Sequence, residues 1–387
     1  MPSATAGCIQ ACGRRRDLSY FARDFAGNVR VTADMGIGVV IIGPIRIRKS
    51  RVAMMLPEFM NEVEITVPGG PDVLKIRKAP IPRLGAGQIL VKVEAAGVNR
   101  PDVIQRQGNY PMPHGVNPIP GLEVAGTVVA IADDVDNFAL GERICGLTNG
   151  GGYAEYCLVP ATQALPIPAK MTAVEAAAVP ETFFTVWANL FQMAAAKRGD
   201  TILIHGGTSG IGTTALMLCK EFSIEAFATA GSAQKCDAIE ALGGKPINYR
   251  TSEFAEEVLA QTGGRGVDIV LDIMGGSYIK GNLAALARDG RLVVIGFLGG
   301  TIADGVDLQA LALKRAKITG STMRARTSPE KAQIARELRM RVWPLLEAGR
   351  CQPIVHRIFP LAEASSAHAM MESGDHIGKI VLRVSDE

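Results

Sequence analysis

The chain has 387 residues, of which 48% are hydrophobic and 20% are charged, with a formal net charge of +3. This composition is too apolar for a disordered chain, the 43 glycines follow no collagen repeat, and the longest apolar run near the start, residues 37–45, is too short to cross a membrane. We therefore expect a soluble globular protein, and the length suggests two domains.

The basic charge belongs to the first 53 residues alone. They carry nine Lys and Arg against three Asp, a net +6, and the rest of the chain is net −3. A mildly acidic body gives no reason to expect nucleic-acid binding. The order of basic and apolar stretches in these residues differs from that of a secretory signal. Their three Asp argue against a transit peptide, which is poor in acids. We expect residues 1–59 to be a non-essential extension, with Met54, Met55 or Met60 as a later start.

Residues 61–159 are predicted to form short strands. Glycine- and proline-rich segments separate them at regular intervals, a pattern typical of a small barrel or sandwich. Two helical stretches follow, at Ala173–Ala178 and Thr182–Ala196. The strand-like runs are Glu62–Val67, Ile89–Ala95, Glu123–Ile131, Arg143–Leu147 and Tyr153–Val159.

From Asp200 onward, strands and helices alternate, which predicts a parallel sheet covered on both faces. Lys317–Thr322 is expected to add a last strand, and the tail to hold a helix at Pro329–Ala348 and a strand at Lys379–Val384. The alternating strands are Thr201–His205, Glu225–Ala230, Ile269–Asp272 and Arg291–Gly296. The helices between them are Ile211–Glu221, Gln234–Leu242 and Tyr278–Ala287.

The sharpest motif is a glycine cluster between the strand at Thr201–His205 and the helix that follows it. Glycines allow a tight turn and a close approach to a pyrophosphate, and the N-terminus of the following helix favours an anion. Gly207, Ser209 and Gly212 fill the three glycine positions of the dinucleotide fingerprint. The predicted cofactor-binding loop is Gly207, Thr208, Ser209, Gly210, Ile211 and Gly212.

The residues after the second strand indicate which dinucleotide binds. An NAD site places an acid about 20 residues beyond the glycine loop, on the ribose diol. Ser232 and Lys235 stand there instead, and a hydroxyl and an ammonium suit a 2′-phosphate. We therefore predict NADPH as the cofactor; the alternative is that Lys235 is an ordinary solvated helix residue.

The seven cysteines form no CxxC pair, and the five histidines show no paired metal-ligand spacing. We expect neither a disulfide framework nor a structural zinc site. Scattered cysteines in apolar surroundings indicate reduced core residues of a cytoplasmic protein. His205 closes a buried strand and is expected to be structural. The sequence contains no GxSxG elbow and no P-loop lysine, which argues against hydrolases and kinases.

Several ordered motifs between Asn61 and Val384 carry a family resemblance. They are Ala96-Gly-Val-Asn-Arg-Pro-Asp102, Gln107-Gly-Asn-Tyr-Pro111, Pro120-Gly-Leu-Glu-Val-Ala-Gly126, the glycine loop and Gly378-Lys-Ile-Val-Leu382. In these the chain resembles the medium-chain dehydrogenase/reductase superfamily, and within it the zinc-free quinone oxidoreductases of the zeta-crystallin and tumour-suppressor-induced type. The resemblance implies an α/β fold: a GroES-like β domain from residues 60–183 and 321–387, and a doubly wound Rossmann domain from residues 184–320.

The same resemblance bears on metal binding. In the superfamily's zinc alcohol dehydrogenases a Cys stands in the place of Asn99, a His in the place of Leu122, and a further Cys near the start of the helix at Pro180–Phe183. Leu122 cannot ligate a metal, so no catalytic zinc is expected. Glu123, which the family retains, is then expected to be structural, holding the barrel turn.

The resemblance also suggests site residues. It places Asn99 and Asp102 in the loop facing the nicotinamide and Tyr110 in the substrate cleft, and these three are the predicted catalytic residues. An Asx turn and a half-buried aromatic are the alternative roles of Asn99 and Tyr110. Ile295, Gly296 and Phe297 end a parallel strand, where ligands approach open sheets. The remaining cofactor-binding residues suggested by the resemblance are Thr185, Tyr249, Met323 and Arg324.

The predicted reaction is NADPH-dependent, zinc-independent reduction of a quinone or similar conjugated carbonyl. The physical argument is that the sequence shows neither a metal nor a strong acid to stabilise an alkoxide, whereas a quinone disperses the incoming charge itself. An enoyl or enone reductase and an NADPH-binding, crystallin-like protein with little turnover are the alternatives. The resemblance implies a homodimer; we expect no membrane partner.

Overall fold

The computed structural model describes residues 56–113 and 115–385, together with the backbone of four short strands before them. These four are β1 (Ala22–Arg23), β2 (Val29–Arg30), β3 (Thr32–Asp34) and β4 (Val39–Ile41), paired antiparallel as β1 with β2 and β3 with β4. The chain divides into two compact units, Met1–Ser50 and Arg51–Glu387. The prediction that the head is dispensable concerns residues that lie mostly outside the described ones.

The first lobe of the larger unit is built on a seven-stranded, largely antiparallel sheet. Its strands run in the order β11-β9-β8-β7-β19-β18, with β10 also paired to β7. A hairpin of β5 (Phe59–Ile65) and β6 (Leu74–Pro80) accompanies it. The strands are β7 (Gln88–Val98), β8 (Glu123–Ile131), β9 (Arg143–Leu147), β10 (Tyr156–Pro160), β11 (Ala164–Pro166), β18 (Val355–Pro360) and β19 (Lys379–Arg383).

The second lobe is a six-stranded parallel sheet in the order β14-β13-β12-β15-β16-β17. The chain winds outward from β12 in one direction and from β15 in the other, and at such a switch point a ligand-binding crevice is expected outside the carboxyl ends of the two strands. The strands are β12 (Thr201–Ile204), β13 (Glu225–Ala230), β14 (Lys245–Asn248), β15 (Val267–Asp272), β16 (Leu286–Val294) and β17 (Lys317–Gly320). The helices are α4 (Gly210–Glu221), α5 (Ala233–Ala241), α6 (Phe254–Gln261), α7 (Ile279–Ala285) and α8 (Leu308–Lys314).

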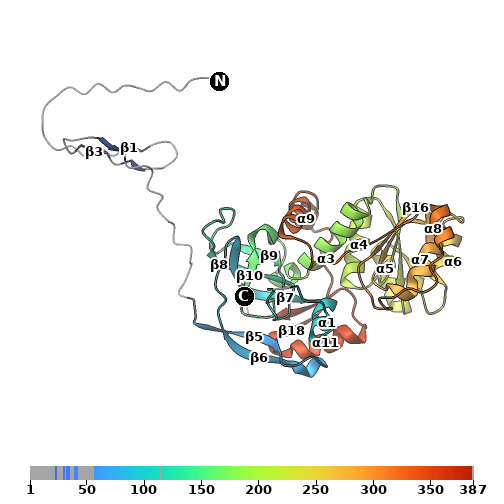
Figure 1. The fold of residues 1–387 in the computed structure, drawn as a ribbon, viewed down its shortest axis with the longest axis horizontal. Helices are drawn as coiled ribbons and strands as arrows, with labels where there is room; N and C mark the ends of the chain where they lie inside the picture. Colours follow the sequence, from blue (N-terminus) through green and yellow to red (C-terminus); the bar gives the residue numbers. More distant parts are fainter. Residues whose placement is uncertain are drawn as a thin grey trace, which may run out of the picture. The chain divides into compact units, whose positions relative to one another are not determined.

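Helices at the junction join the two lobes (Figure 1). α3 (Pro180–Val186) packs against both α4 and α9 (Ser328–Arg341), and it continues as a π-helical segment, Trp187–Met193. One apolar cluster includes residues of both sheets, among them Ala125 and Ile204. The remaining helices are α1 (Arg100–Arg106), α2 (Ala173–Ala176), α10 (Trp343–Glu347) and α11 (Ala364–Ser373).

This architecture confirms the predicted fold class, a GroES-like domain with a Rossmann domain. The tail prediction differs in one place: the helix expected over Pro329–Ala348 is two helices that meet at Val342. Pro344 lacks the N–H that a continuous helix needs there. Within the described residues, none of the helices has the length and apolar character needed to cross a membrane. The predicted boundaries at residues 183 and 320 remain predictions.

Candidate active site

The glycine loop lies at the start of α4, at the carboxyl end of β12. Ser209 caps the helix, its hydroxyl accepting a hydrogen bond from the Gly212 N–H at 3.0 Å. A Cβ at Gly212 would lie 2.3 Å from the Gly206 carbonyl oxygen, so only glycine allows helix and turn to pack this closely. The open N-terminus of this twelve-residue helix suits a pyrophosphate.

The C-terminal strand holds this loop in place from the other lobe. The Gly378 N–H donates to the Thr208 carbonyl at 2.8 Å, and Ser209 and Gly378 form an isolated parallel bridge. A Cβ at Gly210 would lie 2.6 Å from Cδ of Lys379. The cofactor loop and the β domain are therefore in direct contact through the start of β19.

A second group of predicted residues gathers at the carboxyl ends of β13 and β14. A Cβ at Gly231 would lie 2.4 Å from the Tyr249 hydroxyl and 3.4 Å from Nε of Arg250. Ser232 caps α5 beside them, and the Lys235 ammonium donates to the Gly374 carbonyl at the end of α11. Arg250, a cation at this position, was missed by sequence reasoning because β14 itself was not predicted.

At the other end of the crevice, Thr185 lies on α3 and is 8% exposed. Its hydroxyl oxygen is buried without a hydrogen-bond partner among the described residues. A buried hydroxyl without a partner carries a desolvation cost, so the site suits a ligand with a polar group here. Ile295, Gly296 and Phe297 follow the carboxyl end of β16, and Phe297 is half exposed.

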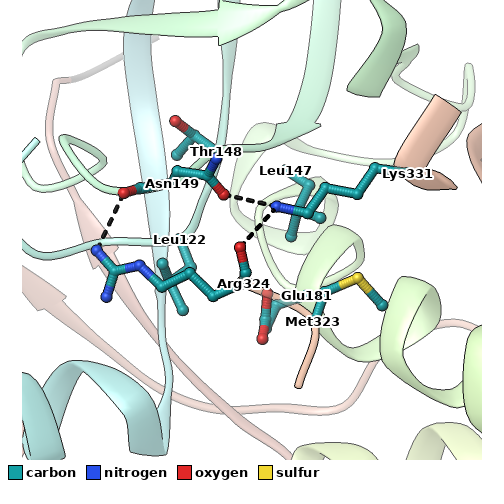
Figure 2. Close-up of a pocket in the computed structure, with 8 residues that line it drawn as sticks. All are labelled: Leu122, Leu147, Thr148, Asn149, Glu181, Met323, Arg324 and Lys331. Carbon is teal, nitrogen blue, oxygen red and sulfur yellow. Dashed lines mark hydrogen bonds between the residues drawn. The ribbon is translucent and has the colours of Figure 1, made fainter. Parts of the chain in front are cut away.

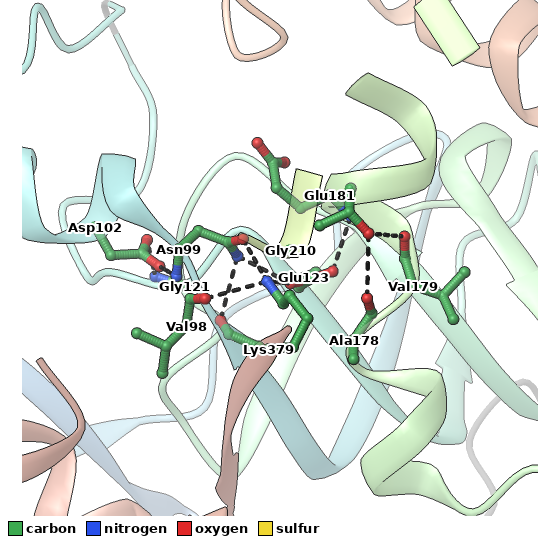
Figure 3. A network of polar contacts seen from close by, with 12 residues as sticks. Val98, Asn99, Asp102, Gly121, Glu123, Ala178, Val179, Glu181, Gly210 and Lys379 are labelled. Carbon is green, nitrogen blue, oxygen red and sulfur yellow. Dashed lines mark hydrogen bonds and ion pairs between the residues drawn. The ribbon is translucent and has the colours of Figure 1, made fainter. Parts of the chain in front are cut away.

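Asn99 lies in a buried polar cluster with Glu123 and Lys379 (Figure 3). Its Nδ2 donates to Oε1 of Glu123 at 2.9 Å, and the Lys379 ammonium donates to the same oxygen at 2.7 Å and to Oδ1 of Asn99. The other Glu123 oxygen accepts the Glu181 N–H at 2.8 Å. Both ends of the Asn99 amide are engaged, and Glu123 ties β8, α3 and β19 together, in line with its expected structural role.

Asp102 is also fully buried and fully satisfied. Its carboxylate accepts from the N–H of Asn99 at 2.9 Å, the N–H of Gly121 at 3.1 Å and the Tyr153 hydroxyl at 3.2 Å. Burial raises the pKa of Asp102 to about 6, while the backbone donors from Asn99 and Gly121 oppose that rise. The carboxylate holds the turn before α1 against the turn before β8.

Tyr110 meets the late cofactor loop. The Arg324 guanidinium carbon lies 5.1 Å from the centre of the Tyr110 ring, a cation–π contact. The guanidinium donates to Oε1 of Gln105 at 2.8 Å and to the Asn149 carbonyl at 3.0 Å, and its Nε is buried without a partner among the described atoms. Burial raises the pKa of Tyr110.

A small pocket beside Arg324 gathers groups that sequence reasoning missed (Figure 2). The Lys331 ammonium donates to Oδ1 of Asn149 at 2.6 Å, and burial lowers the pKa of Lys331 to about 8. Glu181 lines the same pocket, and burial first, then nearby Glu123, raises the pKa of its carboxyl to about 8. The lining residues are Leu122, Leu147, Thr148, Asn149, Glu181, Met323, Arg324 and Lys331.

This pocket corrects one expectation. The sequence predicts no strong acid at the site to stabilise an alkoxide, but Glu181 is a buried carboxyl that faces both cations and other acids. On the sequence Glu181 is one of several acids and Lys331 looks like a solvated helix residue. Their burial follows from the packing of α3 against α9, which no local pattern reveals.

Comparisons with known proteins agree with this geometry. Family models for the alcohol dehydrogenase GroES-like domain and for zinc-binding dehydrogenase match residues 85–169 and 242–382. A solved mycobacterial quinone oxidoreductase is 31% identical, with a TM-score of 0.73, covering 84% of this chain and all of that one. The Escherichia coli quinone oxidoreductase, solved with NADPH, is 28% identical with a TM-score of 0.75 at the same coverage. The human quinone oxidoreductase is 29% identical over 84% of this chain and 98% of its own length.

The chain belongs to the medium-chain dehydrogenase/reductase superfamily. The description of one matching model implies zinc, and the residues present do not fit it. By the family resemblance, Asn99 and Leu122 stand where zinc-holding relatives carry Cys and His, and the start of α3, where a further Cys would fall, contains no Cys. Among residues 56–113 and 115–385, no group of three or more His, Cys, Asp or Glu is placed to hold a metal ion. This member of the superfamily is an oxidoreductase, and its described residues include a glycine loop at the start of α4 and a small pocket lined by Glu181, Arg324 and Lys331.

Proposed function

We propose that this protein is an NADPH-dependent quinone oxidoreductase, acting on quinones or similar electrophilic conjugated carbonyls. The observation that carries the proposal is the direct contact, through Gly378 and Lys379, between the glycine loop and the buried cluster of Asn99 and Glu123. NADPH supplies a hydride when bound. The names of the relatives, quinone oxidoreductases at 28–31% identity, support the same reaction class.

Different residues of the crevice would bind different parts of the cofactor. The α4 N-terminus would hold the pyrophosphate, and Ser232, Lys235 and Tyr249 the 2′-phosphate, joined by Arg250. Thr185, Ile295 and Phe297 would surround the nicotinamide. A charged phosphate gains more from these cations than a ribose hydroxyl does, which favours NADPH over NADH.

The predicted catalytic residues take different roles in this proposal. Tyr110 would face the acceptor, and Tyr110→Phe is expected to alter acceptor affinity while leaving NADPH binding intact. Asn99 and Asp102 act as positioning residues, because their polar atoms are already engaged with Glu123, Lys379 and Tyr153.

The test is NADPH oxidation by the full chain against a panel of acceptors. We expect turnover with a quinone to exceed turnover with a simple aldehyde under saturating cofactor. Activity confined to enoyl thioesters or enones would replace the quinone with the reductase alternative. NADPH binding with no turnover on any acceptor would indicate a binding protein of the crystallin-like kind.

We also propose that the protein is a homodimer formed at β17. This strand is the edge of the six-stranded sheet, and all four of its residues are exposed. Exposed apolar side chains gather in the same part of the chain: Ile302, Leu308, Leu313 and Ile318. An unpaired apolar edge is a pairing surface. Light scattering should give a dimer that Ile318→Lys converts to a monomer; a monomeric wild type would contradict the proposal.

A cytoplasmic location is the last element of the proposal. Cys145, Cys157, Cys219 and Cys351 are free and buried. Buried free thiols in a domain of this size suit a reducing compartment. Fractionation of cells expressing the chain checks this location.

A further inference from the structure

Glu181 combines burial with an unused carboxyl group. It is the second residue of α3, it is 9% exposed, and its backbone N–H is held by Glu123. Among the described residues its carboxyl oxygens accept no hydrogen bond and form no ion pair, although the side chain lines the pocket of Figure 2. Figure 3 shows this carboxyl turned away from the Asn99, Glu123 and Lys379 cluster. A buried carboxyl with no protein partner is free to serve a ligand.

Charged groups of both signs face Glu181. The nearby acids disfavour a negative charge on Glu181, whereas the nearby cations stabilise the Glu181 carboxylate once its proton has left. Burial is the largest influence, and the net result is a pKa of about 8, so the group is mostly protonated at neutral pH. The facing groups are Glu123 on β8, Asp102 on α1, Lys379 on β19, Lys331 on α9, and Arg324 and Tyr110 in loops.

The position of Glu181 also matters. It lies beside Leu122 in the pocket and one turn before Thr185 on α3, the residue proposed to line the nicotinamide. Negative charge builds up on a carbonyl oxygen as it is reduced, and a metal ion is one group that can stabilise such charge. A neutral carboxylic acid can do the same by giving that oxygen a proton.

We propose that Glu181 donates a proton to the carbonyl oxygen of the substrate. The inference rests on the proposed function. The substrate takes a hydride, which is one proton with two electrons, from NADPH, and the cofactor leaves as NADP⁺. The Glu181 O–H bond breaks as the substrate O–H bond forms, so a quinone becomes a hydroquinone. The carboxylate left behind recovers its proton from water, and Lys331 and Arg324 stabilise it in the meantime.

The kinetic test compares wild type, Glu181→Gln and Glu256→Gln, the last an exposed, charge-matched control on α6. General acids contribute about 10²–10⁴-fold, and we expect Glu181→Gln to lower quinone turnover at pH 7 by about 10²-fold because a quinone needs less help. Wild type and the control should lose activity above about pH 8, and Glu181→Gln should not show that alkaline fall. NADPH affinity, followed by fluorescence, should be equal in all three.

A second readout needs no turnover. Infrared spectra of the ligand-free protein should show a protonated carboxyl band at pH 7 that disappears above about pH 8 and is missing from Glu181→Gln. Wild-type turnover in Glu181→Gln, or no such band at pH 7, would overturn the role of Glu181. A wild type that shows the band but reduces neither quinones nor enones with NADPH would overturn the proposed function instead.

Discussion

At the scale of single residues, Asn99 shows how a site residue acts through its neighbours. Its amide donates to Glu123 and accepts from Lys379, both almost completely buried. Asn99→Ala should lower the free energy of unfolding by about 1.5–3 kcal/mol, the range for hydrogen bonds to charged groups. Urea denaturation measures this loss. Unchanged stability together with a sharp fall in turnover would indicate that Asn99 contacts the substrate directly.

The raised pKa of Glu181 makes stability depend on pH. Its folded pKa of about 8 exceeds the ordinary value of 4.5, so the folded chain binds more protons than the unfolded chain between these values. Stability contributed by the protonated group is therefore present below about pH 4.5 and lost as pH rises to about 8. Glu181→Gln should gain stability relative to wild type at pH 9 but not at pH 4, in urea titrations at both values. An equal difference at the two pH values would contradict the burial of an ionisable group here.

In the proposed function, four side chains select NADPH over NADH: Ser232, Lys235, Tyr249 and Arg250. Lys235→Ala and Arg250→Ala should each weaken NADPH binding about ten- to a hundredfold, because a charge-assisted hydrogen bond contributes roughly 1.5–3 kcal/mol. NADH, which has no 2′-phosphate, should be nearly unaffected. Fluorescence titration with both dinucleotides measures the ratio. Equal losses for NADPH and NADH would show that neither cation contacts the 2′-phosphate.

The sequence anticipates some of these residues better than others. The glycine loop, Ser232 and Lys235 could be predicted because strand, turn and helix are contiguous, so spacing alone places them. Glu181 and Lys331 could not, since their roles depend on burial and on contacts between distant segments, and Arg250 was missed because β14 was not predicted. Asn99 was found by resemblance, but its engagement with Lys379, 280 residues away, was not.

At the scale of elements, the boundaries of β8, β9 and β13 are those predicted, because each is a compact apolar run ended by turn or polar residues. β14 was missed: it has four residues and contains Pro246, which is tolerated because β14 is an edge strand paired with β13 alone. The predicted helix at Thr182–Ala196 becomes π-helical from Trp187 onward.

The turn into α4 gives a sharp prediction at this scale. Gly212→Ala replaces a poor helix former with the best one, a local gain of about 1 kcal/mol. The added methyl would, however, lie 2.3 Å from the Gly206 oxygen, and no flexible side chain is there to move aside. The clash should outweigh the gain in helix propensity, so Gly212→Ala should have a lower midpoint of unfolding and weaker binding of both NADPH and NADH. Unchanged dinucleotide affinity would show that the loop can shift at little cost.

At the scale of the whole molecule, the structure locates the first folded residues of the larger unit more closely than the sequence does. β5 begins at Phe59, the Glu58 carbonyl accepts the Ile81 N–H, and Leu56 packs against an apolar cluster. The predicted domain boundary between residues 59 and 60 therefore falls inside β5, a strand that is paired with β6. A chain beginning at Met55 should keep wild-type stability and NADPH binding, whereas one beginning at Met60 should unfold at lower urea. Loss of folding in the Met55 form would show that the head is structural.

The place of β19 in the sheet has a consequence for synthesis. β7 pairs with β19, which is synthesised long after it, as in the match of Val98 with Ile380. The parallel sheet, by contrast, lies within residues 201–320 and has all its strands available before the tail leaves the ribosome. The nascent chain thus carries a nearly complete cofactor lobe beside a sheet still missing two strands, β18 and β19. β19 closes that sheet and brings Gly378 and Lys379 to the glycine loop in a single event, so the contact between the two lobes is completed only once β19 has been made.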